Sequence, residues 1–512
     1  MSPKNFKNPI LPGFHPDPSI CRVGREFYLV TSSFEYFPGV PIFHSRDLVN
    51  WRQLGHVLTR KSQLDLANAP SSCGIYAPTL RYHNGLFYMI TTNVGRIGNF
   101  VVSAKRPEGP WSDPVAIDQD GIDPSLLFDE GRVYYTHCGS GKTFEYPSIK
   151  QAEVDLGTGK YRTKKVIWKG TGGQWVEGPH LFKFGSWYTL IAAEGGTSYG
   201  HSIVAARSKK PFGPFLGCPH NPILTHRDRP KLPIQALGHS DFVELESGEF
   251  WAVLLGIRPR FGRYHHLGRE TMLCPVKFTA DGWPVFENGQ LRSSYPLPKL
   301  EPHPFETPPA RDDFDLPKLR HDWQFVRNPV ARDWSLKARP GFLRLIGSSA
   351  TLDDVTAQSA VVRRQQHFDC VCRTKLDFNP KSENEEAGLF VRAREGFHYD
   401  LSLRRVNGDR RLELFSTING KRCSIGSAKA GSGPIELEVA ADARKYTFTG
   451  FIGKRRHTLG SLPTRGLSGE CVSKHGQMHF TGTMIGVYAT GNGQRCRTPA
   501  DFDWFEYAKR EV

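Results

Sequence analysis

The stretch Val176-Glu177-Gly178-Pro179-His180-Leu181 begins a layout that recurs along the chain. Glu177 is followed eleven positions later by Tyr188, with a glycine and another aromatic residue just before it. Four further copies place an aromatic residue eleven positions after their start: Asp17 with Tyr28, Ala77 with Tyr88, Asp123 with Tyr134, and Ser240 with Trp251. A short strand, a glycine-bearing turn and a second strand rich in aromatic residues are typical of a β-hairpin.

The five starts lie 60, 46, 54 and 63 residues apart. Self-similarity at about 40–50 residues or a little more indicates one small β-sheet per repeat, and five such blades predict a closed five-bladed β-propeller. Equivalent positions of the blades lie near the central axis of a propeller. We therefore expect Asp17, Asp123 and Glu177 to converge there, with Ala77 and His239-Ser240 completing the ring.

Three carboxylates gathered in one cavity would repel one another, and such an arrangement is typical of a functional site. The alternative is that each acid starts a turn, because Asp-Pro is an ordinary turn signal. Asp17 stands between Pro16 and Pro18, which keep it out of a helix and hold it near the start of a strand. The shared register of three acids across five repeats favours the functional interpretation.

The composition is that of a folded protein of two or three domains. The chain has 512 residues, of which 12% are aromatic and 23% charged. It contains no run of 18 apolar residues, so we expect no membrane span. Residues 1–7 have no apolar core and do not resemble a secretory signal, so we expect a cytoplasmic location.

Cysteine usage and charge restrict the partners. The ten cysteines are scattered without a C-x-x-C pair, which favours free thiols. The net charge is +16, but the basic residues are dispersed and no nucleic-acid motif occurs, so we expect no nucleic-acid partner. This charge would mildly favour acid-decorated oligosaccharides, and the sequence leaves homo-oligomer formation open.

The pattern changes after residue 300. Residues 295–309 are dense in proline and are typical of a linker between domains. Beyond them the chain alternates apolar and polar residues, as in 341–345 and 388–392, with Asn-Gly turns typical of an antiparallel β-sandwich. We predict an all-β protein with a catalytic propeller (1–300), a proline-rich linker (301–311) and a concanavalin-like jelly-roll sandwich (312–512).

Three carboxylates on one axis suit glycoside cleavage with inversion. One carboxylate activates water and a protonated acid donates to the leaving oxygen, the two lying roughly 6.5–9.5 Å apart. A third acid can raise the pKa of the proton donor. We assign Asp17 as general base, Glu177 as general acid because its longer arm reaches the bridging oxygen, and Asp123 as modulator, although spacing alone leaves these roles open.

The chain resembles the inverting glycoside hydrolases of family 43, in the branch of β-xylosidases and α-L-arabinofuranosidases that carry a C-terminal sandwich. The matching segments are residues 8–20, 32–51, 121–125, 177–181, 193–197, 268–271, 480–482 and 500–503. The resemblance implies a five-bladed propeller and the same roles for Asp17, Asp123 and Glu177. It implies exo-hydrolysis of terminal xylose, α-L-arabinofuranose or both from short xylo- or arabino-oligosaccharides during hemicellulose breakdown.

The resemblance also implies substrate-binding residues: Phe34, Tyr76, His239, Arg269 and Phe480. Many relatives have Trp where this chain has Tyr76, which would reshape the wall of the site. The loop around Phe480 would close the pocket from the sandwich side. No cofactor is expected to be required and no protein metal ligand is assigned, although the resemblance leaves room for a calcium ion on the axis near His239.

Alternatives remain for these residues and for the activity. Arg269 could be a surface residue paired with Glu270, and both Phe34 and Phe480 could be structural. A retaining enzyme of the invertase type would show different first and acid motifs. An arabinan-active or purely α-L-arabinofuranosidase relative and a non-catalytic carbohydrate-binding propeller also remain. The choice between xylose and arabinofuranose stays open.

Overall fold

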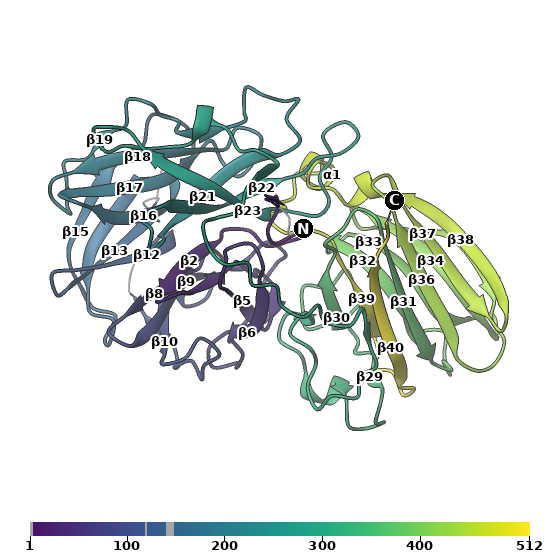
Figure 1. Cartoon of the computed structure of the whole chain (residues 1–512). Helices are drawn as coiled ribbons and strands as arrows, with labels where there is room; N and C mark the ends of the chain where they lie inside the picture. The colour runs from purple at the N-terminus through teal and green to yellow at the C-terminus, as the bar shows by residue number, and fades with distance from the viewer. Residues whose placement is uncertain (1–3, 118–119, 140–147, 512) are drawn as a thin grey trace.

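The computed structural model describes residues 4–117, 120–139 and 148–511. Figure 1 shows two packed β domains, the first in purple to teal and the second in green to yellow. The α-helix of the described chain, α1 (Gly469–Lys474), has six residues, and no described helix is long and apolar enough to cross a membrane. The predicted all-β class is confirmed.

Five antiparallel sheets follow one another along the first domain, so the predicted five-bladed propeller is confirmed. Blade 1 contains β2 (Ser19–Val23), β3 (Glu26–Val30), β5 (Gly39–Ser45) and β6 (Arg52–Leu58). Blade 2 contains β7 (Gly74–Ile75), β8 (Thr79–His83), β9 (Leu86–Val94), β10 (Gly98–Ala104) and β11 (Val115–Ala116). Blade 3 contains β12 (Ile122–Asp129), β13 (Arg132–Gly139), β14 (Ser148–Val154) and β15 (Tyr161–Trp168). Blade 4 contains β16 (Glu177–Phe184), β17 (Trp187–Glu194), β18 (Ser202–Ser208), β19 (Leu216–Gly217) and β20 (Leu224–Thr225). Blade 5 contains β21 (Gln235–Glu244), β22 (Phe250–Ile257), β23 (Glu270–Phe278) and β24 (Pro284–Val285).

The N-terminal segment fastens the ring to blade 5. β1 (Asn5–Lys7) pairs antiparallel with β25 (Ser294–Pro296), and the side chain of Asn8 donates to the carbonyl of Leu273 at 2.9 Å. A further bridge joins Leu11 to Thr271. Segments from the two ends of the propeller thus lie side by side, which joins the first and last blades.

A buried ion pair crosses the inner face of the blades. Arg81 of β8 lies 2.7 Å from the carboxylate of Asp241 on β21, which also accepts a 2.6 Å hydrogen bond from Ser19 of β2. His180 of β16 contacts the same arginine through Nδ1 at 3.0 Å. The Arg81–Asp241 ion pair, with Ser19 and His180, therefore connects four blades. Both of its charges are paired, as buried charges require.

The inner strands of three blades begin with an irregularity that turns a side chain toward the axis. The pairing register shifts just after Ile122 on β12, after Glu177 on β16 and on both sides of Gly238 on β21. The left-handed backbone occurs at these positions and at the start of blade 1, with φ of 52° at Asp17 and 55° at Asp123. Bulges of this kind re-aim side chains next to active sites.

The second domain is a sandwich of two eight-stranded sheets, as predicted. The first sheet contains β26 (Arg311–Asp312), β28 (Trp334–Ser335), β29 (Leu343–Leu345), β31 (Cys370–Asp377), β36 (Ile435–Ala441), β37 (Lys445–Ile452), β38 (Arg455–Pro463) and β40 (Ala500–Lys509). The second sheet contains β4 (Tyr36–Phe37), β27 (Gln324–Val326), β30 (Ser359–Arg364), β32 (Glu386–Arg394), β33 (Phe397–Val406), β34 (Asp409–Ile418), β35 (Lys421–Lys429) and β39 (Met484–Thr490). Short 3₁₀ turns are η1 (Glu287–Gly289), η2 (Ala331–Asp333) and η3 (Thr464–Leu467).

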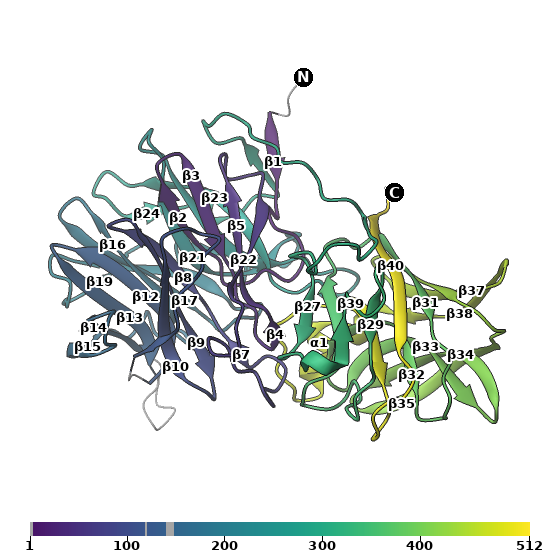
Figure 2. The same cartoon turned by 90° about the horizontal axis from the view of Figure 1, so that it is seen from below.

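One sandwich strand comes from the propeller region of the sequence. β4 follows β3 of blade 1 and pairs with β27, at the contact between the domains in Figure 2. Tyr36 of this strand belongs to an apolar core that both domains share, together with Phe14, Phe34 and Phe390. Residues 297–310 carry no strand. The predicted domain limits at 300 and 312 stay a prediction, because one sheet draws on both sides of them.

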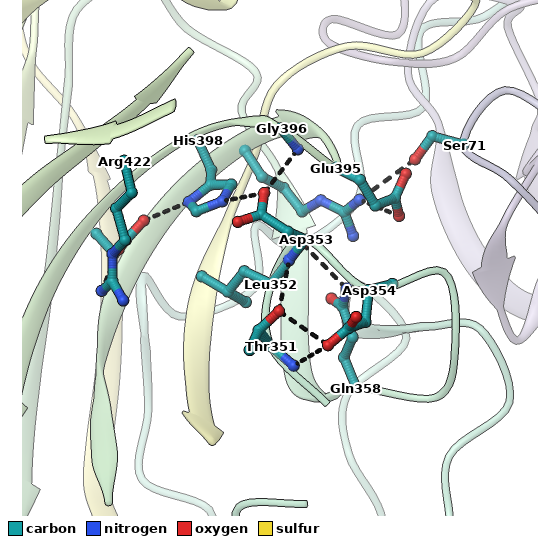
Figure 3. Close-up of polar contacts among 12 residues, drawn as sticks. Ser71, Thr351, Leu352, Asp353, Asp354, Gln358, Glu395, Gly396, His398 and Arg422 are labelled. Atoms are coloured by element: carbon teal, nitrogen blue, oxygen red, sulfur yellow. Dashed lines mark hydrogen bonds and ion pairs between the residues drawn. The ribbon is translucent and has the colours of Figure 1, made fainter. Parts of the chain in front are cut away.

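Buried charges also join the domains. Glu395, at the end of β32, accepts a 2.7 Å hydrogen bond from Arg327 and another from Arg392, whose guanidinium also reaches Ser71 of the propeller. Figure 3 labels Glu395 and Ser71 at this contact, and it also labels His398, whose ring lies between two carboxylates of the sandwich. These buried polar contacts connect the sandwich to the propeller.

Candidate active site

Asp17 is a buried carboxylate held by two kinds of donor. Ser32 Oγ donates to its Oδ2 at 2.6 Å and Arg269 Nη1 donates to its Oδ1 at 2.9 Å. His239 Nδ1 lies 3.7 Å from Oδ1. Burial opposes ionisation of Asp17, but the charges of Arg269 and His239 and the Ser32 hydrogen bond outweigh it, so the pKa lies below its usual range. Asp17 is therefore ionised at neutral pH.

Asp123 occupies the equivalent position of blade 3. Its side chain is buried, and its Oδ2 accepts a 3.0 Å hydrogen bond from the backbone N–H of Gly178. Burial and the charge of Asp17 raise the pKa of Asp123 above its usual range, against the opposing effect of His239. This bond ties the position of Asp123 to the residue that follows Glu177.

Glu177 starts β16 of blade 4, and its side chain keeps 21% of its surface exposed. Burial, followed by the charges of Asp123 and Asp17, raises the pKa of Glu177 to about 8. Its carboxyl therefore keeps a proton at neutral pH while Asp17 is ionised. The charges of Asp123 and Asp17 act on Glu177, and that of Asp17 acts on Asp123, so the three carboxylates lie close enough to interact.

Arg269 connects these acids to the sandwich domain. Besides Asp17, its guanidinium contacts Thr197 Oγ1 at 2.9 Å and donates twice to the carbonyl of Phe480, at 3.1 and 3.2 Å. The residue is buried, and the neighbouring Glu270 pairs with Arg258 instead. The alternative of a surface arginine paired with Glu270 is therefore wrong.

Phe34, Tyr76 and Phe480 form an aromatic cluster next to Arg269. The ring centroids of Phe34 and Tyr76 are 5.3 Å apart, and Phe480 lies 6.0 Å from Phe34 and 6.1 Å from Tyr76. The guanidinium of Arg269 lies 5.6 Å from the rings of both Phe34 and Phe480. Phe34 is 1% exposed, so it packs in the interdomain core, whereas Tyr76 and Phe480 are partly exposed.

The sandwich loop, residues 480–482 just before β39, packs closely against the segment that carries Arg269. A Cβ added to Gly482 would lie 2.2 Å from the carbonyl oxygen of Leu267, and one added to Gly268 would lie 2.8 Å from Gly482 Cα. Phe480 N–H also donates to Ser72 Oγ of the propeller at 3.0 Å. Phe480 thus reaches the propeller site as the resemblance implied, by a backbone approach that only glycine permits.

His239 lies on the inner ring, buried, with φ 49°. A Cβ added to Gly178 would lie 2.9 Å from its Nδ1, so the glycine leaves room for this imidazole beside Glu177. Across residues 4–117, 120–139 and 148–511, no group of three or more His, Cys, Asp or Glu side chains is placed to hold a metal ion. A calcium ion near His239 stays a prediction.

Sequence reasoning missed three contacts of the site. Ser32 and Thr197 lay inside segments of the family resemblance, but no local pattern shows that their hydroxyls meet Asp17 and Arg269. His201 was not singled out at all. It precedes β18, is 1% exposed, and its Nε2 lies 3.7 Å from Glu177 Oε1.

An ionised carboxylate beside a protonated one is the pair of groups that glycoside hydrolases use as base and acid. The comparison with known families agrees. Residues 6–284 match glycosyl hydrolases family 43, and residues 311–508 match the β-xylosidase C-terminal concanavalin A-like domain. The chain belongs to glycosyl hydrolase family 43.

Similar proteins match over nearly the full chain. A non-reducing end α-L-arabinofuranosidase of Bacteroides ovatus is 45% identical over 513 residues, covering 99% of this chain and 95% of that protein. A xylosidase/arabinosidase of Butyrivibrio fibrisolvens is 38% identical and covers 97% and 98%. The structure of a xylan β-1,4-xylosidase from Bacillus halodurans has a TM-score of 0.94 at 38% identity, covering 99% of this chain and 100% of that one.

Proposed function

We propose that this protein is an inverting exo-glycosidase that removes terminal xylose, α-L-arabinofuranose or both from short xylo- or arabino-oligosaccharides. The observation that carries the proposal is the opposite shift of two pKa values on one ring. The pKa of Asp17 is lowered by Arg269 and that of Glu177 is raised to about 8 by burial and neighbouring carboxylates. An ionised base and a protonated acid then coexist at neutral pH.

In the proposed mechanism Asp17 acts as the general base. Its ionised carboxylate takes a proton from a water molecule, whose oxygen attacks the anomeric carbon from the face opposite the leaving group. Ser32 and Arg269 hold the carboxylate in place, through the contacts at 2.6 and 2.9 Å. The configuration at the anomeric carbon is thereby inverted.

Glu177 acts as the general acid. Its protonated carboxyl donates to the glycosidic oxygen as the C–O bond breaks, so the leaving sugar departs as a neutral alcohol. Asp123 acts through Glu177, since its negative charge favours the protonated form of the acid. Its bond to the N–H of Gly178 keeps this charge near the acid.

The aromatic cluster and the sandwich loop support exo action. Phe34, Tyr76 and Phe480 gather beside the carboxylates, and sugar rings pack well on aromatic faces. The guanidinium of Arg269 is engaged by Asp17, Thr197 and Phe480, so it would bind a terminal sugar by exchanging one of these contacts for a sugar hydroxyl. Because Phe480 belongs to the sandwich, a long polysaccharide would meet this domain beside the site, which favours chain ends.

Two experiments test the reaction. Proton NMR during early turnover should show the inverted anomer accumulating before mutarotation, and first appearance of the retained anomer would contradict the assignment. Glu177→Gln should abolish hydrolysis of xylobiose while leaving sugar binding intact. Unchanged hydrolysis by this variant would favour the alternative, a carbohydrate-binding propeller whose apparent activity comes from another source.

The preferred sugar can be decided by one parallel assay. The similar proteins carry both xylosidase and arabinofuranosidase names, and these two sugars are the candidates. Wild-type protein should be assayed on nitrophenyl β-xyloside, nitrophenyl α-arabinofuranoside and xylobiose. Activity on the arabinofuranoside alone would indicate a pure α-L-arabinofuranosidase, and activity on arabinan would indicate an arabinan-active relative.

A further inference from the structure

His201 is a buried polar residue that plays no part in the mechanism proposed above. It lies in blade 4 directly before β18 and is 1% exposed. Neither ring nitrogen meets strict hydrogen-bond geometry with a partner in the described part of the chain, and the Ala236 backbone lies only close enough to influence the pKa of the ring. A buried polar atom without a partner costs free energy, so its retention beside reactive groups calls for an explanation.

The backbone around His201 is shaped to its ring. A Cβ added to Gly238 of β21 would lie 2.0 Å from Cε1 of the imidazole and 2.3 Å from each ring nitrogen. The ring therefore packs directly on the bare backbone of the next blade, and this contact prevents it from turning away. Packing of this kind holds Nε2 at 3.7 Å from Glu177 Oε1.

Glu177 lacks the support that the other two acids have. Asp17 accepts hydrogen bonds from Ser32 and Arg269, and Asp123 accepts one from the backbone of Gly178. Within the described ranges the Glu177 carboxyl accepts no hydrogen bond, and His201 is the one basic side chain within 4 Å of it. A carboxyl group that must present one oxygen to the substrate needs something to fix its other oxygen.

We infer that His201 is a positioning residue for the general acid: its Nε2–H donates to Glu177 Oε1 in the substrate complex, so that the protonated Oε2 faces the glycosidic oxygen. The inference rests on the proposed role of Glu177. The present separation of 3.7 Å is longer than a hydrogen bond, as catalytic contacts often are before substrate binds.

The electrostatics of the ring suit this role. Burial, followed by the charges of His239 and Arg269, lowers the pKa of His201 to about 3, with a partial offset from the Ala236 backbone and Asp17. The imidazole is therefore neutral and offers one N–H without adding a cation that would remove the proton from Glu177. The proton of Oε2 moves to the glycosidic oxygen, the C–O bond breaks, and His201 loses no proton. The N–H···O bond strengthens as the carboxylate forms.

A matched pair of amides tests the inference. In His201→Gln the side-chain nitrogen lies near the position of Nε2, whereas in His201→Asn the amide is one carbon shorter and falls short of Glu177. We expect His201→Asn to lower kcat/KM for xylobiose about 10- to 100-fold, the range for one lost hydrogen bond to a charged group. His201→Gln should recover most of this loss. If His201→Asn does not fold, His201→Leu gives the same comparison.

The leaving group separates positioning from a merely structural role. A 2,4-dinitrophenyl glycoside needs no protonation of its leaving oxygen, so His201→Asn should stay within about threefold of wild type on it. Equal losses on xylobiose and on the dinitrophenyl substrate, or equal losses in the Gln and Asn variants, would overturn the inference. Arabinofuranosyl counterparts serve if wild-type protein prefers them.

A pH profile adds a second readout. Loss of a donor to the carboxylate raises the pKa of Glu177 in the substrate complex, so the basic limb of kcat, which reports that complex, should move to higher pH in His201→Asn and not in His201→Gln. Asp123, Asp17 and Arg269, together with the thiol of Cys138, also face Glu177 and are unchanged in both variants. Collapse of Glu177→Gln on xylobiose without this pattern would refute the inference about His201 alone, whereas an active Glu177→Gln would refute the proposed function.

Discussion

The charge of Asp123 should set the pH at which the enzyme loses activity. Glu177 has a pKa of about 8 in the folded protein against an ordinary value of 4.5. That rise corresponds to about 5 kcal/mol in favour of the protonated form. Burial is the largest cause, and the charges of Asp123 and then Asp17 follow. Since the acid must carry its proton, kcat/KM should fall as pH rises through about 8.

Asp123→Asn removes one of these charges and keeps an oxygen that can accept from the N–H of Gly178, now at 3.0 Å. With less repulsion the ionised form of Glu177 becomes easier to reach, so its pKa falls. A nearby charge shifts a carboxyl pKa by about one to three units. We therefore expect the basic limb of kcat/KM for xylobiose to move down by about one pH unit or more.

The assay is the pH dependence of kcat/KM, with the titration of Glu177 followed by carbon NMR in the same variants. Asp129→Asn is the matched control, because Asp129 ends the same strand β12 and pairs with Lys183 at 2.8 Å. It should leave the limb near pH 8. A limb that stays in place or moves to higher pH in Asp123→Asn would refute the assignment of Asp123 as the modulator of the acid.

Three further predictions concern the site and the fold. Arg269→Leu should move the acid limb of the kcat/KM profile to higher pH, because the lowered pKa of Asp17 depends on the guanidinium. Arg269→Lys should keep this limb in place but lose about 10- to 100-fold in kcat/KM. Acid limbs at the same pH in both variants would count against this role of Arg269. Gly482→Ala should reduce activity and lower the urea midpoint, since the added Cβ would lie 2.2 Å from a backbone oxygen, whereas Gly431→Ala, with nothing within 4 Å, should do neither. His398 has a folded pKa of about 9, despite burial, because two carboxylates flank it (Figure 3). Its contribution of about 3 kcal/mol to the free energy of unfolding should be present below pH 6.5 and be lost as pH rises through 9. Urea unfolding measured against pH should show this slope in wild type and not in His398→Gln.

Repetition made much of the catalytic ring predictable. Each blade repeats the same local signals, a turn glycine and an aromatic strand, and closure of the ring then requires equivalent positions to meet on the axis. Asp17, Asp123 and Glu177 were predicted in this way without any knowledge of contacts. The sandwich followed from two-residue alternation and Asn-Gly turns, which are also local.

The partners of Arg269 could not be predicted from local sequence signals. Its sequence neighbour Glu270 is an acceptable partner, yet Arg269 bonds to Asp17, 252 positions away, and to the carbonyl of Phe480, 211 positions away. Arg269 lies in the bend just before β23, whereas Glu270 is the first residue of that strand and pairs with Arg258 instead. The choice between the two carboxylates depends on which face of blade 5 meets the axis, and both were consistent with the sequence.

The sequence by itself determined the number of blades and the presence of a second β domain and predicted the three acids, because these depend on periodic local patterns. Only the tertiary structure decided the pairing of β4 with β27, the approach of Gly482 to Leu267 and the place of His201. The acid and base assignments also needed it for their electrostatic support. Burial and the charges around a carboxyl group shift its pKa, and both arise from segments that meet only when the chain is folded.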